Sequence, residues 1–181
     1  MKYFVNCATD QKNVVGSPIL AIALVNQKEG LFIKTTTRPV SQDAIDNLSP
    51  ALVKSSPAKT VVCQGDQIMS YIKTFLPEVG SLEFFVRRGF EANVLAEMIT
   101  QENQNSSFFE GRNIAIFVLG RLKYTSRLSH KQVNHPYWEA HQLMKTIQES
   151  TTVKNMFRRM TQGLSLLALF EVLRFFIFQH L

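Results

Sequence analysis

Cysteine is scarce in this chain, and its scarcity limits the chemistry that the chain can carry. The 181 residues include two cysteines, Cys7 and Cys63, and each lies within an apolar run. We predict that both are buried free thiols, with a disulfide or a shared metal as the alternative. No cysteine or aspartate completes a zinc pattern with His135 and His141. We therefore expect no zinc site.

Several common signatures of enzymes and of secretion are also missing. The eight glycines form no Gly-rich phosphate-binding loop, and no serine, histidine and aspartate stand in a supporting hydrolase motif. The first apolar run is interrupted at Asn6, which leaves it too short for the apolar core of a secretory signal. These absences favour a soluble protein of a reducing compartment, and we predict a cytoplasmic location.

The composition is that of a folded domain with a basic surplus. Hydrophobic residues make up 45% and charged residues 19%, which excludes a disordered chain. A chain of 181 residues can form one domain with a full core and a modest appendage. The net charge of +6 attracts polyanions and acidic membrane surfaces, but many basic proteins bind neither. Nucleic acid is therefore one alternative among several.

Apolar runs and turn signals predict an α/β fold in which a mixed sheet is flanked by helices. Three apolar runs at residues 2–9, 19–25 and 31–37 predict strands that form a meander. Farther on, apolar residues spaced three and four apart predict two helices with a strand between them. The later elements that we expect are a short helix over 42–48 capped by Ser41, a loop at 49–57, an extended run at 60–63, a helix over 68–76 with its cap at Asp66, a strand at 81–86, a helix over 90–99, a loop at 101–107, a buried strand or helix at 113–119, and a helix that starts with Pro136.

The composition changes after residue 150, so we divide the chain into a domain of residues 1–150 and an extension of residues 151–181. The extension is basic first and then apolar nearly all round a helical wheel over residues 164–181. We predict a hydrophobic helical tail that packs on the body or on another chain, as a homo-oligomer or with a protein partner. Membrane association through this tail is the alternative. Glu171 and Arg174 oppose it, because a charge at the centre of a membrane-spanning helix costs about 2.5–3.5 kcal/mol.

Three short segments carry acidic or amide side chains where the predicted elements begin or end. The first strand ends with Asn6-Cys7-Ala8, the helix over 90–99 begins with Phe90-Glu91-Ala92, and the last helix begins with Asn134-His135-Pro136-Tyr137-Trp138-Glu139-Ala140. In order and spacing these segments resemble the motifs of the DEDD 3′–5′ exonuclease superfamily, and within it the short stand-alone bacterial exoribonucleases of the ribonuclease T and oligoribonuclease kind. The resemblance covers residues 1–150 and implies a ribonuclease H-like exonuclease core.

The resemblance also implies a catalytic site of four carboxylates. In the family they hold two divalent metals, which activate water and stabilise the leaving oxygen of a phosphodiester. Every matching position departs from that pattern. Asn6 stands for an aspartate, Ala8 for a glutamate, and Glu91 and Glu139 for aspartates; the general base falls at Asn134, with His135 one residue out of register. We interpret Asp10, just beyond the first strand, as a turn residue and not as a replacement ligand.

We therefore predict a catalytically defective exonuclease homologue that acts as a nucleic-acid-binding or protein-interaction module and holds no cofactor. Without two carboxylates of the first strand, the site lacks most of the negative charge that a hard cation needs. The alternative is a divergent 3′–5′ exonuclease that uses Glu91, Glu139 and His135, with Mg²⁺ or Mn²⁺, on single-stranded RNA or DNA. Apart from the resemblance, the two glutamates are ordinary acids of a first helical turn, which the helix dipole favours.

Basic residues precede the second and third motif segments. In the fold that the resemblance implies, both stretches border the substrate groove. We predict that they contact phosphates without reading sequence, in a salt-sensitive manner, and a solvated surface is the alternative. The residues are Arg87, Arg88, Arg121, Lys123, Arg127 and Lys131.

Overall fold

A computed structural model describes residues 1–11, 14, 16–52, 56–120 and 134–151, and the statements below concern these residues. The chain forms two compact units, Met1–Met144 and Lys145–Leu181. All of the strands described below belong to the first unit. The tail expected over residues 164–181 lies outside the described residues, and so does most of the predicted extension.

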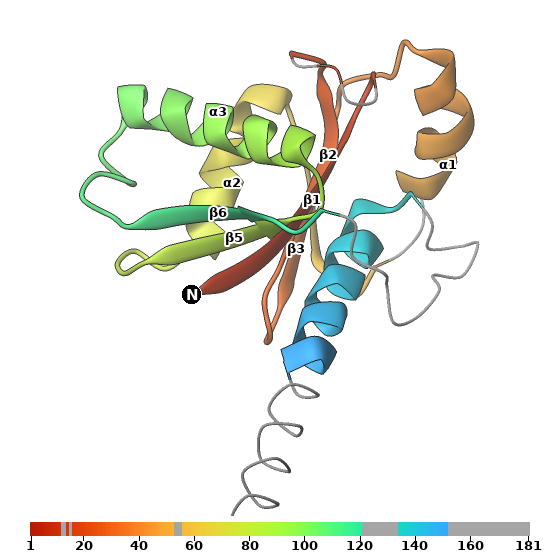
Figure 1. Ribbon diagram of the computed structural model, residues 1–181. Coiled ribbons are helices and arrows are strands. Elements are labelled where there is room, and N and C mark those ends of the chain that lie inside the picture. Colours follow the sequence, from red (N-terminus) through yellow and green to blue (C-terminus); the bar gives the residue numbers. More distant parts are fainter. Residues whose placement is uncertain (12–13, 15, 53–55, 121–133, 152–181) are drawn as a thin grey trace, which may run out of the picture. The chain divides into compact units, whose positions relative to one another are not determined.

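Within the described residues six strands form one mixed sheet, in the order β4-β3-β2-β1-β5-β6 (Figure 1). β1, β2 and β3 are antiparallel neighbours, which confirms the predicted meander, and the other three pairings are parallel. The run at 113–119, which the sequence left open between strand and helix, contains an edge strand. The bounds are β1 Lys2–Thr9, β2 Ile19–Val25, β3 Gly30–Thr35, β4 Lys59–Cys63, β5 Leu82–Val86 and β6 Ile114–Val118.

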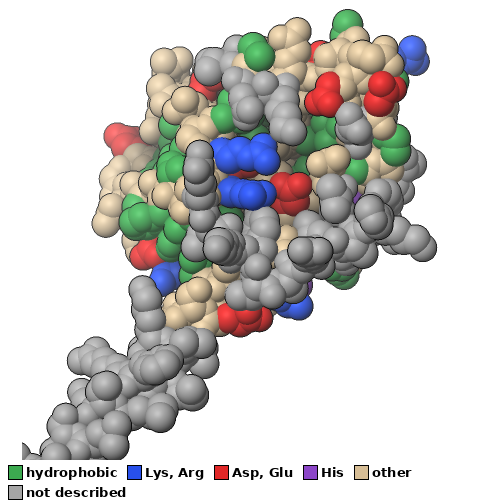
Figure 2. All heavy atoms as spheres, turned by 45° about the vertical axis from the view of Figure 1, so that its right-hand side comes forward, with side chains coloured by type: hydrophobic (Ala, Val, Ile, Leu, Met, Phe, Trp, Pro, Cys, Tyr) green, Lys and Arg blue, Asp and Glu red, His purple; other side chains and the backbone are tan. Residues whose placement is uncertain are grey.

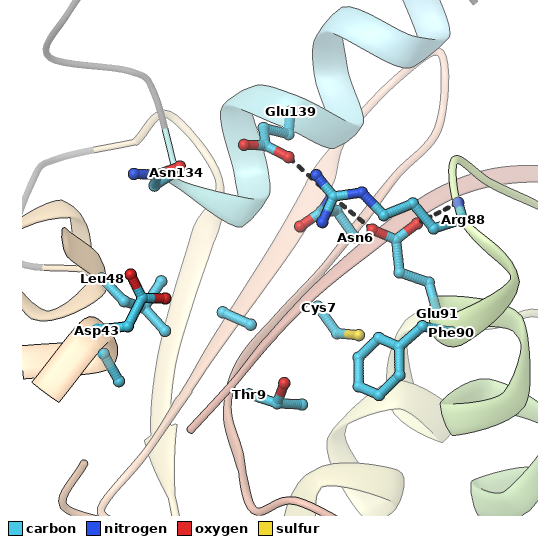
Figure 3. Close-up of a pocket in the computed structure, with 12 residues that line it drawn as sticks. Asn6, Cys7, Thr9, Asp43, Leu48, Arg88, Phe90, Glu91, Asn134 and Glu139 are labelled. Carbon is cyan, nitrogen blue, oxygen red and sulfur yellow. Dashed lines mark hydrogen bonds between the residues drawn. The ribbon is translucent and has the colours of Figure 1, made fainter. Parts of the chain in front are cut away.

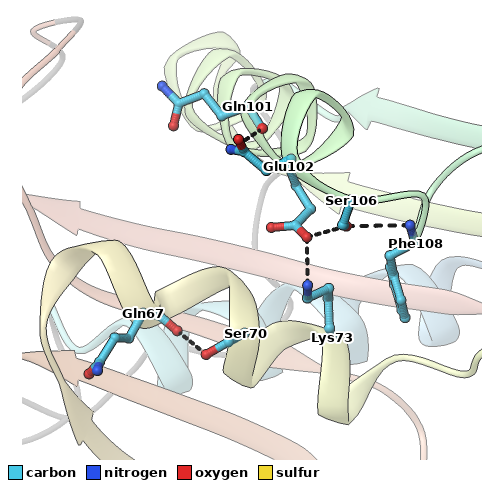
Figure 4. A network of polar contacts seen from close by, with 8 residues as sticks. Gln67, Ser70, Lys73, Gln101, Glu102, Ser106 and Phe108 are labelled. Carbon is cyan, nitrogen blue, oxygen red and sulfur yellow. Dashed lines mark hydrogen bonds and ion pairs between the residues drawn. The ribbon is translucent and has the colours of Figure 1, made fainter.

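Two helices, α2 (Ile68–Phe75) and α3 (Gly89–Asn105), cover one face of the sheet. The predicted loop at 101–107 is wrong for residues 101–105, because α3 continues to Asn105. Glu102 in its last turn accepts a hydrogen bond from Lys73 of α2 at 2.5 Å and another from Ser106 (Figure 4). This tertiary contact stabilises a helical turn whose polar composition suggested a loop.

The loop predicted at 49–57 is also wrong in its first part. Residues 42–52 are helical, with a π-helical segment η1 (Ala44–Leu48) followed by α1 (Ser49–Leu52). Ser41 caps this stretch as predicted, since its hydroxyl oxygen accepts from the Ala44 N–H at 3.3 Å. Pro50 lies inside this continuous helical stretch, two residues after the end of the π-helical segment. The cap predicted at Asp66 is wrong, because Asp66 lies inside a 3-10 turn, η2 (Gly65–Gln67), and the residue that precedes α2 is Gln67.

Alternate residues of the strands point to the two faces of the sheet, which separates the core from the candidate site. Tyr3 and Val5 belong to the apolar cluster that packs against α2 and α3. Phe32 points to the other face, where its ring lies 4.6 Å from that of His135, just before the helical residues 136–151. A Cβ atom at Gly30 would lie 2.6 Å from Cε2 of Tyr137, so glycine allows this helix to approach β3.

Cys7 and Cys63 are free thiols, as predicted; Cys63 is buried, whereas Cys7 is partly exposed. Among the described residues, no helix is both long enough and apolar enough to cross a membrane.

Candidate functional site

The end of β1 opens into a cleft of about 150 Å³ that collects most of the predicted motif positions (Figure 3). β1 forms its floor, the helical stretch 42–52 one wall, and the first turns of α3 and of helix 136–151 the others. Five of the six predicted catalytic positions line this cleft, and His135 does not. The lining residues are Asn6, Cys7, Ala8, Thr9, Asp43, Ala44, Leu48, Arg88, Phe90, Glu91, Asn134 and Glu139.

The side-chain amide of Asn6 bridges the two glutamates of the cleft. Its Nδ2 atom donates to Oε1 of Glu91 and to Oε2 of Glu139, both at 3.1 Å. Ionised carboxylates only accept hydrogen bonds, so the NH₂ group must face them. A neutral amide with two polar hydrogens thus lies between two carboxylates that would otherwise repel each other.

Glu91 is fixed from its other side by the backbone at the start of α3. Its Oε2 atom accepts from the N–H groups of Arg87 at 2.9 Å and Arg88 at 3.0 Å. As the third residue of α3, Glu91 supplies the acidic half of a capping box, and the helix dipole favours its charge. Burial nevertheless raises the pKa of Glu91, which is 3% exposed; the Arg88 contacts oppose that rise and the charge of Glu139 adds to it.

Cys7 and Asp43 also line the cleft, and of these two the sequence did not predict Asp43. Burial first, and then the charge of Glu91, raises the pKa of the Cys7 thiol to about 12. The raised pKa keeps the thiol protonated at neutral pH, which disfavours Cys7 as a thiolate nucleophile. Cys7 belongs to the first motif segment, which ends the first strand. Asp43 had no comparable signal, because its segment was predicted only as part of a short helix.

His135, the predicted displaced base, is fully buried and has a structural role. Its Nδ1 atom accepts from the N–H of Tyr137 at 3.2 Å, and its carbonyl accepts from the N–H of Glu139 at 3.1 Å. These contacts cap the helix that Pro136 starts. Asn134 is exposed and lines the cleft in a left-handed conformation, with φ of 62°, which asparagine tolerates better than most residues.

Of the residues predicted to contact phosphate, Arg88 lines the cleft. Arg87 directly follows the last residue of β5 and precedes Arg88 in the chain. Both side chains are partly exposed. In Figure 3 the Arg88 side chain extends from the start of α3 into the cleft. Basic and acidic side chains lie side by side on the face in Figure 2, so that surface has mixed charge. The remaining predicted contacts, Arg121, Lys123, Arg127 and Lys131, lie outside the described residues.

Asp10 is a loop anchor, in agreement with its interpretation as a turn residue. One of its carboxylate oxygens accepts from the N–H groups of Val40 at 2.7 Å and Ser41 at 3.0 Å. Ser41 in turn donates its hydroxyl to the Asp10 carbonyl. Asp10 therefore holds the segment that leads into the helical wall of the cleft, and it is not among the residues that line it.

Three carboxyl groups line the cleft, those of Asp43, Glu91 and Glu139. Glu91 and Glu139 are both engaged by the Asn6 amide, and Ala8 supplies no ligand. Hard cations such as Mg²⁺ require several oxygen ligands, preferably anionic ones. In the part of the chain that the structure describes, no group of three or more histidine, cysteine, aspartate or glutamate side chains is arranged to hold a metal.

Comparison with known proteins adds no relative: no family model, no curated protein and no solved structure matches this chain.

Proposed function

We propose that this chain is a catalytically defective homologue of the DEDD 3′–5′ exonucleases that acts as a binding module, with single-stranded nucleic acid as its first candidate ligand. The observation that carries the proposal is the Asn6 amide, which occupies the space between Glu91 and Glu139. In the family that the chain resembles, the corresponding space belongs to metal ions. Here an internal hydrogen-bond donor neutralises the repulsion between the carboxylates.

The order of the elements supports the same proposal. Three antiparallel strands open the chain. After the helical stretch 42–52 and β4, the helix α2, the strand β5 and the helix α3 follow, and a later helix is capped by His135. This is the order on which the resemblance rests, and it brings Asn6, Ala8, Glu91, Asn134 and Glu139 to one cleft. A ribonuclease H-like core explains why residues so far apart in sequence converge there.

The charges of the cleft argue against hydrolysis. A two-metal mechanism stabilises the attacking and the leaving oxygen with cations that the protein's carboxylates retain. Asn6 is neutral, Ala8 has no polar side-chain atom, and each remaining glutamate already accepts a hydrogen bond from the protein. Mg²⁺ or Mn²⁺ would have to displace the amide before it could bind both glutamates.

We expect purified protein not to degrade single-stranded RNA or DNA oligonucleotides in the presence of Mg²⁺ or Mn²⁺. Product formation on denaturing gels, with 5′-labelled substrates, measures this directly. A Glu139→Ala variant, purified in the same way, identifies contaminating nuclease, because a contaminant would persist in it. Metal-dependent turnover by the natural sequence that disappears in this variant would establish the divergent exonuclease instead.

Binding should depend on the basic pair Arg87 and Arg88. We expect a fluorescent single-stranded oligonucleotide to bind weakly, with affinity that falls steeply as salt rises. The double variant Arg87→Ala/Arg88→Ala should lower the affinity and reduce the slope of log affinity against log salt by about 1.4, since each phosphate contact on a single strand contributes about 0.7.

A matched control is Lys28→Ala/Lys59→Ala, which removes the same charge from two exposed positions that do not line the cleft. Equal losses in both double variants would mean that only net charge matters. No binding by the natural sequence at low salt would leave a protein as the ligand of the module.

A further inference from the structure

β6 is an edge strand, and one side of its backbone has no strand beside it among the described residues (Figure 1). Toward β5, the Asn113 carbonyl accepts from Leu82 and the Leu119 N–H donates to Val86. Because residues of a strand alternate in the direction of their hydrogen-bonding groups, Ile114, Ile116 and Val118 direct theirs away from β5. These groups form a row of donors and acceptors at the rim of the sheet.

β6 has none of the usual features that prevent another strand from pairing with an edge strand. Its sequence, Ile-Ala-Ile-Phe-Val, has no charge and no proline, and the strand pairs with β5 without a register shift. Natural edge strands are usually protected by charged side chains, prolines or β-bulges. The opposite edge, β4, begins with Lys59. Phe117 and Val118 are 43% and 51% exposed, which is high for large apolar residues at the end of a strand.

A row of aromatic rings crosses the sheet and ends at this edge. Phe4 of β1 stacks on Phe85 of β5 with 5.2 Å between ring centroids, and Phe85 stacks on Phe117 of β6 at 4.9 Å. Each ring lies directly opposite the next in the strand register. Phe117 is the most exposed of the three, so the outer side of the row remains open to one more side chain.

We propose that β6 pairs antiparallel with β6 of a second copy of this chain, with Ile116 on the two-fold axis. This register places Ala115 opposite Phe117 on one face, so that a small residue accommodates a large one. On the other face it places Ile114 opposite Val118 and Ile116 opposite itself. The outward N–H and C=O groups of one β6 then form hydrogen bonds with those of the other. These groups belong to Ile114, Ile116 and Val118. The two sheets become one continuous sheet.

The self-complementary sequence is the reason to choose a second copy as the occupant. An isologous interface must match itself under a two-fold rotation, and an uncharged strand with this small-to-large pairing does so without like charges meeting. The proposal is independent of the proposed function, because β6 does not line the cleft.

Sedimentation velocity on the full chain over a concentration series tests the proposal. We expect the mass to rise from the monomer value of 20.6 kDa toward twice that value. Val118→Lys should raise the dissociation constant at least tenfold, because it places a charge beside Ile114 of the second copy. Val62→Lys is the matched control: Val62 is 61% exposed on the opposite edge strand, and its variant should dimerise like the natural sequence.

A second measurement tests the register. Ile116→Cys brings two thiols together across the axis, so mild oxidation or a short bismaleimide should produce a covalent dimer, whereas Val62→Cys should produce none. The unmodified protein gives the background from Cys7 and Cys63. A natural sequence that stays monomeric at several hundred micromolar would overturn the proposal. A dimer that Val118→Lys does not weaken would overturn it as well, since the contact must then lie elsewhere.

Discussion

Asn6→Asp should destabilise the folded chain by about 3–5 kcal/mol at neutral pH. The substitution keeps the shape of the side chain but replaces an NH₂ donor with an oxygen. Two hydrogen bonds to charged groups are lost, each of which contributes about 1.5–3 kcal/mol. A third carboxylate then faces Glu91 and Glu139, and a buried charge without a partner is costly. Urea denaturation at pH 7.5 in the presence of a chelator measures the loss.

The deficit of the Asn6→Asp variant should shrink as the pH falls. Burial already raises the folded-state pKa of Glu91 above its ordinary value of 4.5, and the carboxylate that the substitution introduces would raise it further. A carboxyl group with a raised folded-state pKa gives stability that is fully present below the unfolded-state value. That stability is lost as the pH rises through the folded-state value. Because a carboxyl group of the cleft can take up a proton, the loss of stability in Asn6→Asp is also limited at neutral pH.

Divalent cations should reverse the effect in this variant alone. A carboxylate at position 6, between those of Glu91 and Glu139, forms a better site for Mn²⁺ than the amide does, and binding to the folded state stabilises it. The control is Asn6→Leu, which also removes the amide but adds no ligand. If Mn²⁺ raises the melting temperature of Asn6→Leu or of the natural sequence as much as that of Asn6→Asp, the cation binds elsewhere. An Asn6→Asp variant as stable as the natural protein would show that the amide bridge is unimportant.

The strands could be predicted from sequence because alternating and continuous apolar runs are local patterns. The errors arose where a distant residue decided the outcome. The last turn of α3 is polar in sequence, and only the contact of Glu102 with Lys73 shows why it stays helical. Pro50 suggested a break, but the stretch 42–52 stays helical through it, with a π-helical segment just before it. The parallel pairing of β4 with β3 is likewise invisible in a local pattern.

In the candidate site, too, local patterns could be predicted from the sequence and contacts between distant residues could not. The motif segments predicted which residues would meet, and Asn6, Glu91 and Glu139 do line one cleft. The sequence could not predict that the amide would bridge both glutamates, because this depends on distances of 3.1 Å across three elements. The role of His135 could have been predicted: it directly precedes Pro136, and the residue before a first-turn proline stands at the cap.

His135→Ala should destabilise the chain by about 3–5 kcal/mol. His135 is fully buried, and its ring packs against Phe32 at 4.6 Å between centroids. Truncating a large buried side chain leaves a cavity that costs about 2–5 kcal/mol. The Tyr137 N–H also loses its acceptor, and the loss of a helix cap costs about 1 kcal/mol. Urea unfolding should show a lower midpoint with an unchanged slope.

Two further variants separate the cap from the cavity and from any functional role. His135→Asn keeps a good capping residue, so its loss of stability should be smaller than that of His135→Ala by about 1 kcal/mol. His141→Ala, in the same helix, removes a half-buried ring that contacts Tyr137 and Trp138, and it should cost less than either. If His135→Ala instead leaves stability unchanged but abolishes oligonucleotide binding, His135 belongs to the binding site. The buried cap predicts the opposite pattern, with stability lost and binding retained by the fraction that remains folded.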